Sequence, residues 1–122
     1  MARVLIAEDE GILRMSFSMI LRQLDNVVVA EASTGAEAVD AVERGSVEVV
    51  FMDICMDGLD DGINACSKIK AMHPEIKIVF VSAYPESAYT EKLTGVSYDG
   101  YLEKPVDQSH FQNCLSRFRM LS

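Results

Sequence analysis

Apolar and polar residues alternate along this chain in a pattern that predicts strands and helices in turn. Continuous apolar runs, typical of strands buried on both faces of a sheet, occupy residues 4–7, 27–30, 49–52, 76–81 and 100–102. Between these runs the apolar residues recur at helical spacing, over residues 11–24, 35–43, 63–72, 84–93 and 108–121. Five strands alternating with five helices predict an α/β fold, in which right-handed crossovers place helices on both faces of a parallel sheet.

Local signals strengthen some of these helices and weaken one. Thr34, followed three residues later by Glu37, is typical of a capping box that begins the second helix. Pro85 lies near the start of the fourth helix and makes it the weakest of the set. The residues expected to face the core are Leu13, Phe17, Ile20, Leu21 and Leu24 in the first helix and Ala36, Val39 and Val42 in the second.

Length and composition predict one globular domain over residues 1–122, because 49% apolar and 25% charged residues are ordinary proportions. No apolar run approaches the ~18 residues that a membrane span needs, so no membrane contact is expected. A strand begins almost at once after Met1, which predicts no signal peptide and a cytoplasmic location. The three cysteines, Cys55, Cys66 and Cys114, match neither a zinc site nor a disulfide framework, as expected in a reducing compartment.

The formal net charge of −8 predicts that this domain does not bind nucleic acid, since phosphate binding needs clustered Lys and Arg. The acidic residues concentrate in residues 8–10 and 57–61. Such a run is usually a solvated face. Two runs that each follow a predicted strand favour a site instead.

Polar residues that follow four of the strands are predicted to meet, because the carboxyl ends of parallel strands share one edge. They are Glu8 and Asp9 after the first strand, Asp53 after the third, Ser82 after the fourth and Lys104 after the fifth. Carboxylates placed close together either acquire raised pKa values or need a cation. Mg²⁺ suits a site that offers a few carboxylate oxygens and keeps several waters.

Each of these residues also has a simpler interpretation by itself. An Asp after a strand is most often a turn or capping residue, and a Ser or Lys at such an edge is most often at the surface. Lys104 could form a purely structural ion pair with the carboxylates. The arrival of all the residues at one edge of a regular alternation is what favours a functional site.

Together these residues resemble the receiver domain of two-component response regulators, and the resemblance spans essentially the whole chain. It depends on Glu8-Asp9, Asp53, Ser82-Ala83 and Lys104-Pro105, with Tyr101 just ahead of the last pair. The resemblance implies a CheY-like, flavodoxin-like three-layer sandwich with strand order 2-1-3-4-5. It implies a signalling phosphoacceptor rather than an enzyme, with at most self-phosphorylation and autodephosphorylation.

The resemblance also implies a role for each residue. Asp53 would accept a phosphoryl group from a histidine kinase or a histidine phosphotransfer protein. Mg²⁺, or Mn²⁺ in its place, would be held by Asp9, Asp53 and the backbone carbonyl of Cys55, with Glu8 acting through water. Lys104 and the Ser82 hydroxyl would contact phosphoryl oxygens, and Tyr101 would turn from an exposed to a buried position. Cys55 and Tyr84, each two residues beyond a site residue, would tune hydrolysis.

The loop after Asp53 departs from the commonest receiver pattern. Many receivers have Pro four residues after the acceptor and Gly eight residues after it, whereas here Asp57 and Asp61 occupy those places. The glycines fall instead at Gly58 and Gly62, which resembles a variant with a longer loop. We therefore expect an intact site with an altered loop over residues 57–62.

The first helix has more apolar residues than its core-facing stripe uses. Ile12, Met15 and Met19 lie at i, i+3 and i+7 on one flank, beside the acidic residues. They are either partly covered core residues or an exposed patch that receives the helical hairpin of a histidine-bearing partner. The resemblance leaves the downstream partner open: a separate protein, an attached output domain or a second copy in a phosphorylation-dependent homodimer.

Three other classes of protein share parts of this pattern. A phosphatase with an aspartyl-phosphate intermediate, like the haloacid dehalogenases, needs a second Asp two residues after the nucleophile, where this chain has Cys55. A flavin carrier needs a phosphate-binding loop after the first strand, where Glu8-Asp9-Glu10 would repel a phosphate. An interaction module that is never phosphorylated would be expected to lack a site residue.

Overall fold

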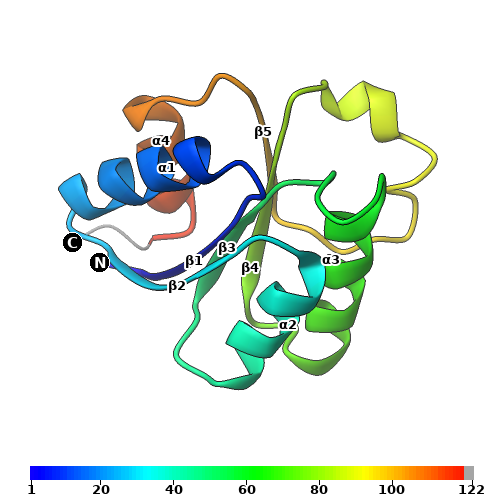
Figure 1. Ribbon diagram of the computed structural model, residues 1–122, viewed down its shortest axis with the longest axis horizontal. Coiled ribbons are helices and arrows are strands. Elements are labelled where there is room, and N and C mark those ends of the chain that lie inside the picture. Colours follow the sequence, from blue (N-terminus) through cyan, green and yellow to red (C-terminus); the bar gives the residue numbers. More distant parts are fainter. Residues whose placement is uncertain (120–122) are drawn as a thin grey trace.

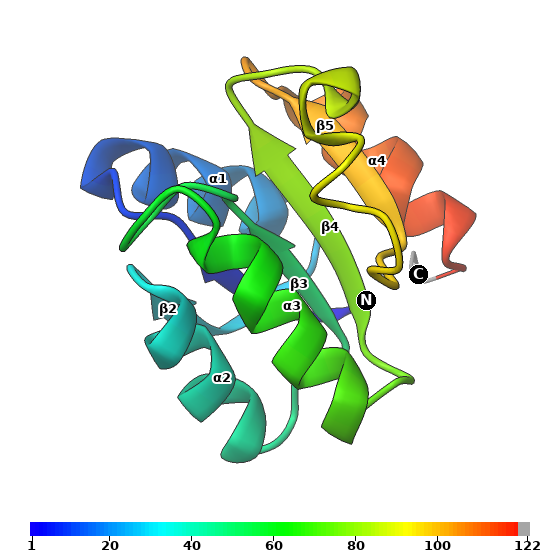
Figure 2. The same ribbon diagram turned by 90° about the vertical axis from the view of Figure 1, so that its right-hand side faces the viewer.

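A computed structural model describes residues 1–119 as a sandwich of three layers (Figures 1 and 2). The strands are β1 (Arg3–Ala7), β2 (Val27–Ala32), β3 (Val49–Met52), β4 (Lys77–Ser82) and β5 (Gly100–Glu103). The helices are α1 (Gly11–Gln23), α2 (Gly35–Glu43), α3 (Asp61–Met72) and α4 (Gln108–Arg117), with a 3₁₀ helix, η1 (Glu86–Tyr89), before β5. Among the described residues no helix is both long and apolar enough to cross a membrane.

The sheet has five parallel strands in the order β2-β1-β3-β4-β5. Helices α1 and α4 cover one face, and α2 and α3 cover the other (Figure 1). The predicted α/β fold and its strand order are therefore confirmed.

Burial on both faces explains why the strands are continuous runs of apolar residues in the sequence. Every residue of β3 is buried, and β1 and β4 are buried apart from their first residues, because helices lie over both faces of the central strands. On the α1 and α4 side the core is built around Phe111. Its ring meets Phe51 edge-on, with ring centroids 4.9 Å apart, and Phe17 at 5.5 Å. The predicted stripe of α1 faces this core.

The prediction of a fourth α-helix over residues 84–93 is wrong. Only η1 forms, and turns follow it. Pro85 precedes η1, and the hydroxyls of Thr90 and Thr94 donate to backbone carbonyls three or four residues earlier, at 3.1 and 3.0 Å. Apolar residues of this segment still contribute to the core, since Tyr89 and Leu93 are buried on the α2 and α3 side of the sheet.

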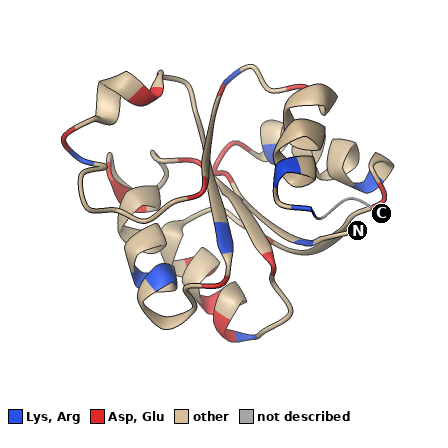
Figure 3. Cartoon of the chain, turned by 180° about the vertical axis from the view of Figure 1, so that it is seen from behind, with Lys and Arg blue, Asp and Glu red and all other residues tan. Residues whose placement is uncertain are grey.

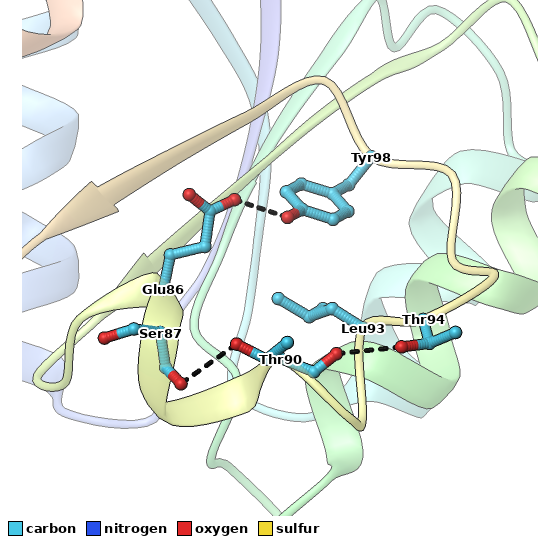
Figure 4. Close-up of a pocket in the computed structure, with 6 residues that line it drawn as sticks. All are labelled: Glu86, Ser87, Thr90, Leu93, Thr94 and Tyr98. Carbon is cyan, nitrogen blue, oxygen red and sulfur yellow. Dashed lines mark hydrogen bonds between the residues drawn. The ribbon is translucent and has the colours of Figure 1, made fainter.

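Figure 4 shows a cavity between η1 and the segment that leads into β5. Its lining residues are Glu86, Ser87, Thr90, Leu93, Thr94 and Tyr98. The Tyr98 hydroxyl donates to the Glu86 carboxylate, and this bond is the main reason that the pKa of Tyr98 is raised to about 12. The bond therefore joins the start of η1 to the chain just before β5.

Smaller details of the helices differ from expectation. The Thr34 hydroxyl caps α2 by accepting the Glu37 amide, as predicted, but the Glu37 carboxylate returns to the amide of Ser33. Ala36 is exposed rather than inward-facing, and Ala38 is buried instead. The last helix begins at Gln108 as predicted but ends at Arg117, earlier than the predicted residue 121, which lies outside the described residues.

One aspartate and two glycines shape the loop between β3 and the start of α3. The Asp61 carboxylate accepts the amide of Gly35 at 2.8 Å and that of Asp57 at 2.9 Å, which joins the loop to the start of α2. Gly58 has a φ of 111°, a conformation that favours glycine. A Cβ on Gly62 would lie 2.0 Å from the backbone oxygen of Asp53, so only glycine fits beside this peptide.

Replacing Gly62 with Ala should therefore lower the free energy of unfolding by about 3 kcal/mol, because the backbone around Asp53 must move to admit the methyl group. Urea unfolding followed by circular dichroism measures the change. Gly11→Ala is the matched control, since the nearest atom to its Cβ would lie 3.8 Å away. It should stay within about 1 kcal/mol of the parent. Equal stability of the two variants would contradict this account of Gly62.

Candidate functional site

The carboxyl ends of β1 and β3 bring three carboxylates together. The register pairs Ala7 with Met52, and the Asp53 amide donates to the Ala7 carbonyl at 2.9 Å, so the residues after both strands lie side by side. Carboxylate oxygens of Glu8, Asp9 and Asp53 all lie within 4.8 Å of one another. In Figure 3 these acidic segments lie at the ends of the two strands. The predicted convergence of these three residues is thus present.

Lys104 extends from the end of β5 into this cluster. Its Nζ lies 2.6 Å from Glu8 Oε1 and 3.2 Å from Asp53 Oδ2. Glu8 is 1% exposed and Asp53 8%, so both depend on polar partners inside the protein. Asp53 Oδ1 accepts the Cys55 amide at 3.3 Å, and Glu8 Oε2 accepts the Glu10 amide at 3.1 Å. The shorter of the two contacts of Lys104 is therefore the one with Glu8.

The electrostatics of the cluster favour a cation. Burial acts to lower the pKa of Lys104, but its hydrogen bond to Glu8 and the charges of Asp53 and Glu8 outweigh burial, so the pKa is raised. The pKa of Asp9 is also raised, first by burial and then by its neighbour Glu8. One ammonium thus faces three carboxylates. Two negative charges of the cluster are therefore left without an opposite charge from Lys104.

This donor set fits a hard divalent cation. Three carboxylates from two strand ends supply oxygen atoms, which Mg²⁺ prefers, and the exposed Asp9 leaves room for water on the metal. Glu8 is already bonded to Lys104 and to the Glu10 amide, which agrees with an indirect contact through water. The part assigned to the Cys55 carbonyl stays a prediction.

Ser82 and Tyr101 meet through the backbone of Tyr84. Ser82 is buried at the end of β4, where its carbonyl accepts the Lys104 amide at 2.7 Å and its hydroxyl accepts the Tyr84 amide at 3.1 Å. The hydroxyl of the half-buried Tyr101 donates to the Tyr84 carbonyl at 2.7 Å, and burial is the main cause of its raised pKa. One peptide segment therefore connects the two side chains.

The flank of α1 is open to solvent. Ile12 is 82% exposed, Met15 58% and Met19 56%, so these side chains are not part of the core. That they receive the helical hairpin of a partner stays a prediction. Ser16 lies between this patch and a second hollow that Phe17 and Lys104 help to line. The apolar surface thus runs from the flank of α1 to the carboxylate cluster.

Four contacts near the site have no signal in the sequence. The Cys55 thiol lies 3.6 Å from the Tyr89 hydroxyl and donates to the Leu59 carbonyl at 3.3 Å. Burial, followed by this contact with Cys55, raises the pKa of Tyr89 to about 12. Lys92 pairs with Asp60 at 2.8 Å, and Arg14 donates to the Glu8 carbonyl at 2.8 Å. The helical spacing of apolar residues over 84–93 does not reveal these partners.

Fold and site together define a flavodoxin-like α/β protein with a carboxylate cluster that suits a divalent cation. Residues 4–116 match the family model of the response regulator receiver domain, and the chain belongs to this family. It is thus a receiver domain of the kind found in two-component systems.

Relatives with curated descriptions include regulators and a kinase. The chain is 36% identical over 126 residues to the transcriptional regulatory protein PdtaR of Mycobacterium tuberculosis, covering 98% of this chain and 60% of the relative. It is 37% identical over 106 residues to the sensor kinase CckA of Brucella abortus, covering 85% of this chain and 11% of the kinase. The chain therefore corresponds to only part of these longer proteins.

Solved structures agree with this assignment. The receiver domain of AraT, a response regulator from Geobacillus stearothermophilus, is 29% identical with a TM-score of 0.82, covering 95% of this chain and 91% of that one. The receiver domain of a sensor histidine kinase from Pseudomonas aeruginosa PAO1 is 25% identical with a TM-score of 0.84, covering 95% of both chains. The latter structure has a magnesium ion coordinated in its active-site cleft.

Replacing Lys104 with Met should lower the free energy of unfolding by about 3 kcal/mol, because it leaves the buried Glu8 carboxylate without its cation. Guanidinium chloride unfolding in metal-free buffer measures this loss. The double variant Glu8→Gln/Lys104→Met should recover at least half of it, since the Glu8 charge is gone and only the Asp53 carboxylate is left without the ammonium. If the double variant is no more stable than Lys104→Met, the pair does not account for the burial of Glu8.

Proposed function

We propose that Asp53 is the phosphoacceptor of this receiver domain and that its phosphorylation changes a protein-interaction surface. The observation that carries the proposal is the position of Asp53 beside one ammonium group and two other carboxylates. Lys104 lies 3.2 Å from one carboxylate oxygen, and the carboxylates of Glu8 and Asp9 lie beside it in the cluster. A carboxylate held at the edge of the sheet in this way is oriented for attack on an electrophile.

In the proposed reaction, an oxygen of Asp53 attacks the phosphorus of a phosphohistidine in line with the bond to nitrogen. The P–N bond breaks as the P–O bond forms, the imidazole leaves with its electron pair, and solvent protonates it. Mg²⁺, or Mn²⁺ with similar oxygen preference, would supply charge neutralisation on the transferred group when bound by Asp9, Asp53 and the Cys55 carbonyl. Lys104 changes partner from the carboxylate to a phosphoryl oxygen.

The proposed switch runs through Ser82 and Tyr101. The Ser82 hydroxyl oxygen accepts the Tyr84 amide. Its own O–H would donate to a phosphoryl oxygen on Asp53, because a charged oxygen is a stronger acceptor than a neutral one. Movement of the segment around Tyr84 toward the site would then displace the Tyr84 carbonyl, which accepts the hydrogen bond of the Tyr101 hydroxyl. The affected surface includes η1, β5 and α4. Its partner is a downstream protein, an attached output domain or a second copy of the chain.

The proposed phosphodonor is a histidine kinase or a histidine phosphotransfer protein that docks on α1. The exposed side chains of Ile12, Met15 and Met19 form an apolar patch beside the carboxylates, and such a patch fits the helical hairpin that carries a histidine. We also propose a cytoplasmic location. The cysteines of the described residues are all free, as in a reducing compartment. The chain would act as a phosphoacceptor, with no substrate turned over beyond its own phosphoryl group.

Incubation with acetyl phosphate and Mg²⁺ should add one phosphoryl group, about 80 Da, to the intact mass. Asp53→Asn should gain nothing, because an amide is a poor nucleophile at phosphorus. Omission of Mg²⁺ should abolish labelling of the parent protein. Folded parent protein that gains no mass with Mg²⁺ present, or an Asp53→Asn variant that is labelled equally, would refute the acceptor role.

Met15→Glu should slow phosphotransfer from a purified, autophosphorylated histidine kinase that labels the parent protein, on the order of tenfold, because a charge enters the apolar contact. Labelling by acetyl phosphate should stay unchanged, since Met15 does not touch the carboxylates. Met72→Glu is the matched control, because Met72 is 59% exposed, almost as Met15 is, but lies on α3. Equal loss with both phosphodonors, or equal slowing by Met72→Glu, would rule out docking on α1.

A further inference from the structure

Arg14 is a second cation at the acidic turn, and the function proposed above does not use it. Its Nη1 donates to the backbone carbonyl of Glu8 at 2.8 Å, and its Nε lies 3.4 Å from Oε1 of Glu31. Arg14 belongs to the first turns of α1, Glu8 follows β1 and Glu31 lies in β2. One guanidinium therefore joins three segments of the fold at the point where the acidic turn leaves the sheet.

The bond from Arg14 acts on the peptide that connects Glu8 to Asp9. The Glu8 amide is held by the Ala32 carbonyl at 2.9 Å, and the Glu8 side chain is held by Lys104 at 2.6 Å and the Glu10 amide at 3.1 Å. The carbonyl of Glu8 is the remaining polar group of the residue, and Arg14 holds it. Because a peptide group is planar, the direction of this carbonyl sets the direction in which the chain enters Asp9.

Asp9 needs such support more than its neighbours do. Glu8 and Asp53 are buried and touch Lys104, whereas the Asp9 side chain is exposed. Its place in the cluster therefore depends on its backbone. Arg14 also reaches this turn through its own amide, which donates to the Glu10 carbonyl at 2.9 Å.

An arginine suits this position better than a lysine does. The planar guanidinium donates along two directions at once, so it can contact a carbonyl and a carboxylate in a fixed relative geometry. The Arg14 side chain is 27% exposed and that of Glu31 39%, so both are partly ordered by their surroundings. The pair is thus part of the architecture of the turn.

We propose that Arg14 is a positioning residue for the metal-binding carboxylates: by holding the Glu8 carbonyl it orients the Glu8–Asp9 peptide and so keeps the Asp9 carboxylate facing Asp53. Outer-shell groups that orient metal ligands typically change metal affinity by 10–100-fold when removed. The inference rests on the proposed function, because it concerns the binding of Mg²⁺ that phosphoryl transfer to Asp53 requires.

A Mg²⁺ titration followed by the backbone amide NMR signals around Asp9 and Asp53 tests the proposal without any phosphodonor. Arg14→Met should raise the Kd for Mg²⁺ about tenfold. Arg14→Lys should recover part of the loss, because an ammonium can reach the Glu8 carbonyl but cannot fork to Glu31 as well. Arg22→Met, which removes an exposed arginine from the last turn of the same helix, should leave the Kd within about twofold.

Thermal unfolding of the same variants separates positioning from stability alone. A folded Arg14→Met protein with an unchanged Kd for Mg²⁺ and a lowered Tm would overturn the inference and leave the proposed function intact. A parent protein that shows no Mg²⁺-dependent shifts would instead overturn the proposed function. Labelling of Arg14→Met by acetyl phosphate should return to the parent rate at saturating Mg²⁺, because the residue acts on the metal site and does not touch the phosphoryl group.

Discussion

The burial of negative charge at the carboxyl edge of the sheet is the constraint on which the rest of the structure depends. Glu8 and Asp53 are almost fully buried, and a buried carboxylate is tolerated only where hydrogen bonds and an opposite charge replace its water. Lys104 meets this requirement, with its ammonium within 3.2 Å of both. It reaches them from a strand that lies two places away from β3 in the sheet. The site thus exists only when β1, β3 and β5 are assembled, which makes its geometry a direct product of the fold.

The loop after Asp53 shows how an altered sequence can preserve the site. Gly62 packs against the Asp53 peptide with no room for a side chain, and the Asp61 carboxylate ties the loop to the start of α2. Asp57, where proline is common in receivers, contributes its amide to the same carboxylate. The longer loop therefore remains anchored at both ends, and Asp53 stays in line with the other strand ends.

The segment between β4 and β5 is where this receiver differs most from the expected pattern of helices. A 3₁₀ helix and turns replace the α-helix, and they are held by the contact of Tyr89 with Cys55, the pair of Lys92 with Asp60 and the bond of Tyr98 with Glu86. Two of these contacts lead to the loop that follows Asp53. Cys55 also bears on the rival class, because a phosphatase like the haloacid dehalogenases needs a second Asp at that position, where this chain has a thiol that donates to the Leu59 carbonyl.

Local patterns in the chain were enough to predict the alternation of strands and helices, the buried strands and the residues of the cluster. These features follow from local periodicity and from the shared edge of parallel strands. The same patterns also predicted a fourth α-helix that does not form, because apolar spacing records which side chains are buried and does not reveal that threonine hydroxyls and a proline favour turns. Three further features emerge only when the chain is folded: Lys104 pairs most closely with Glu8, the flank of α1 is exposed and Arg14 holds the Glu8 carbonyl. Each of these depends on distances between residues far apart in the chain or on what covers a surface, and no local pattern encodes either.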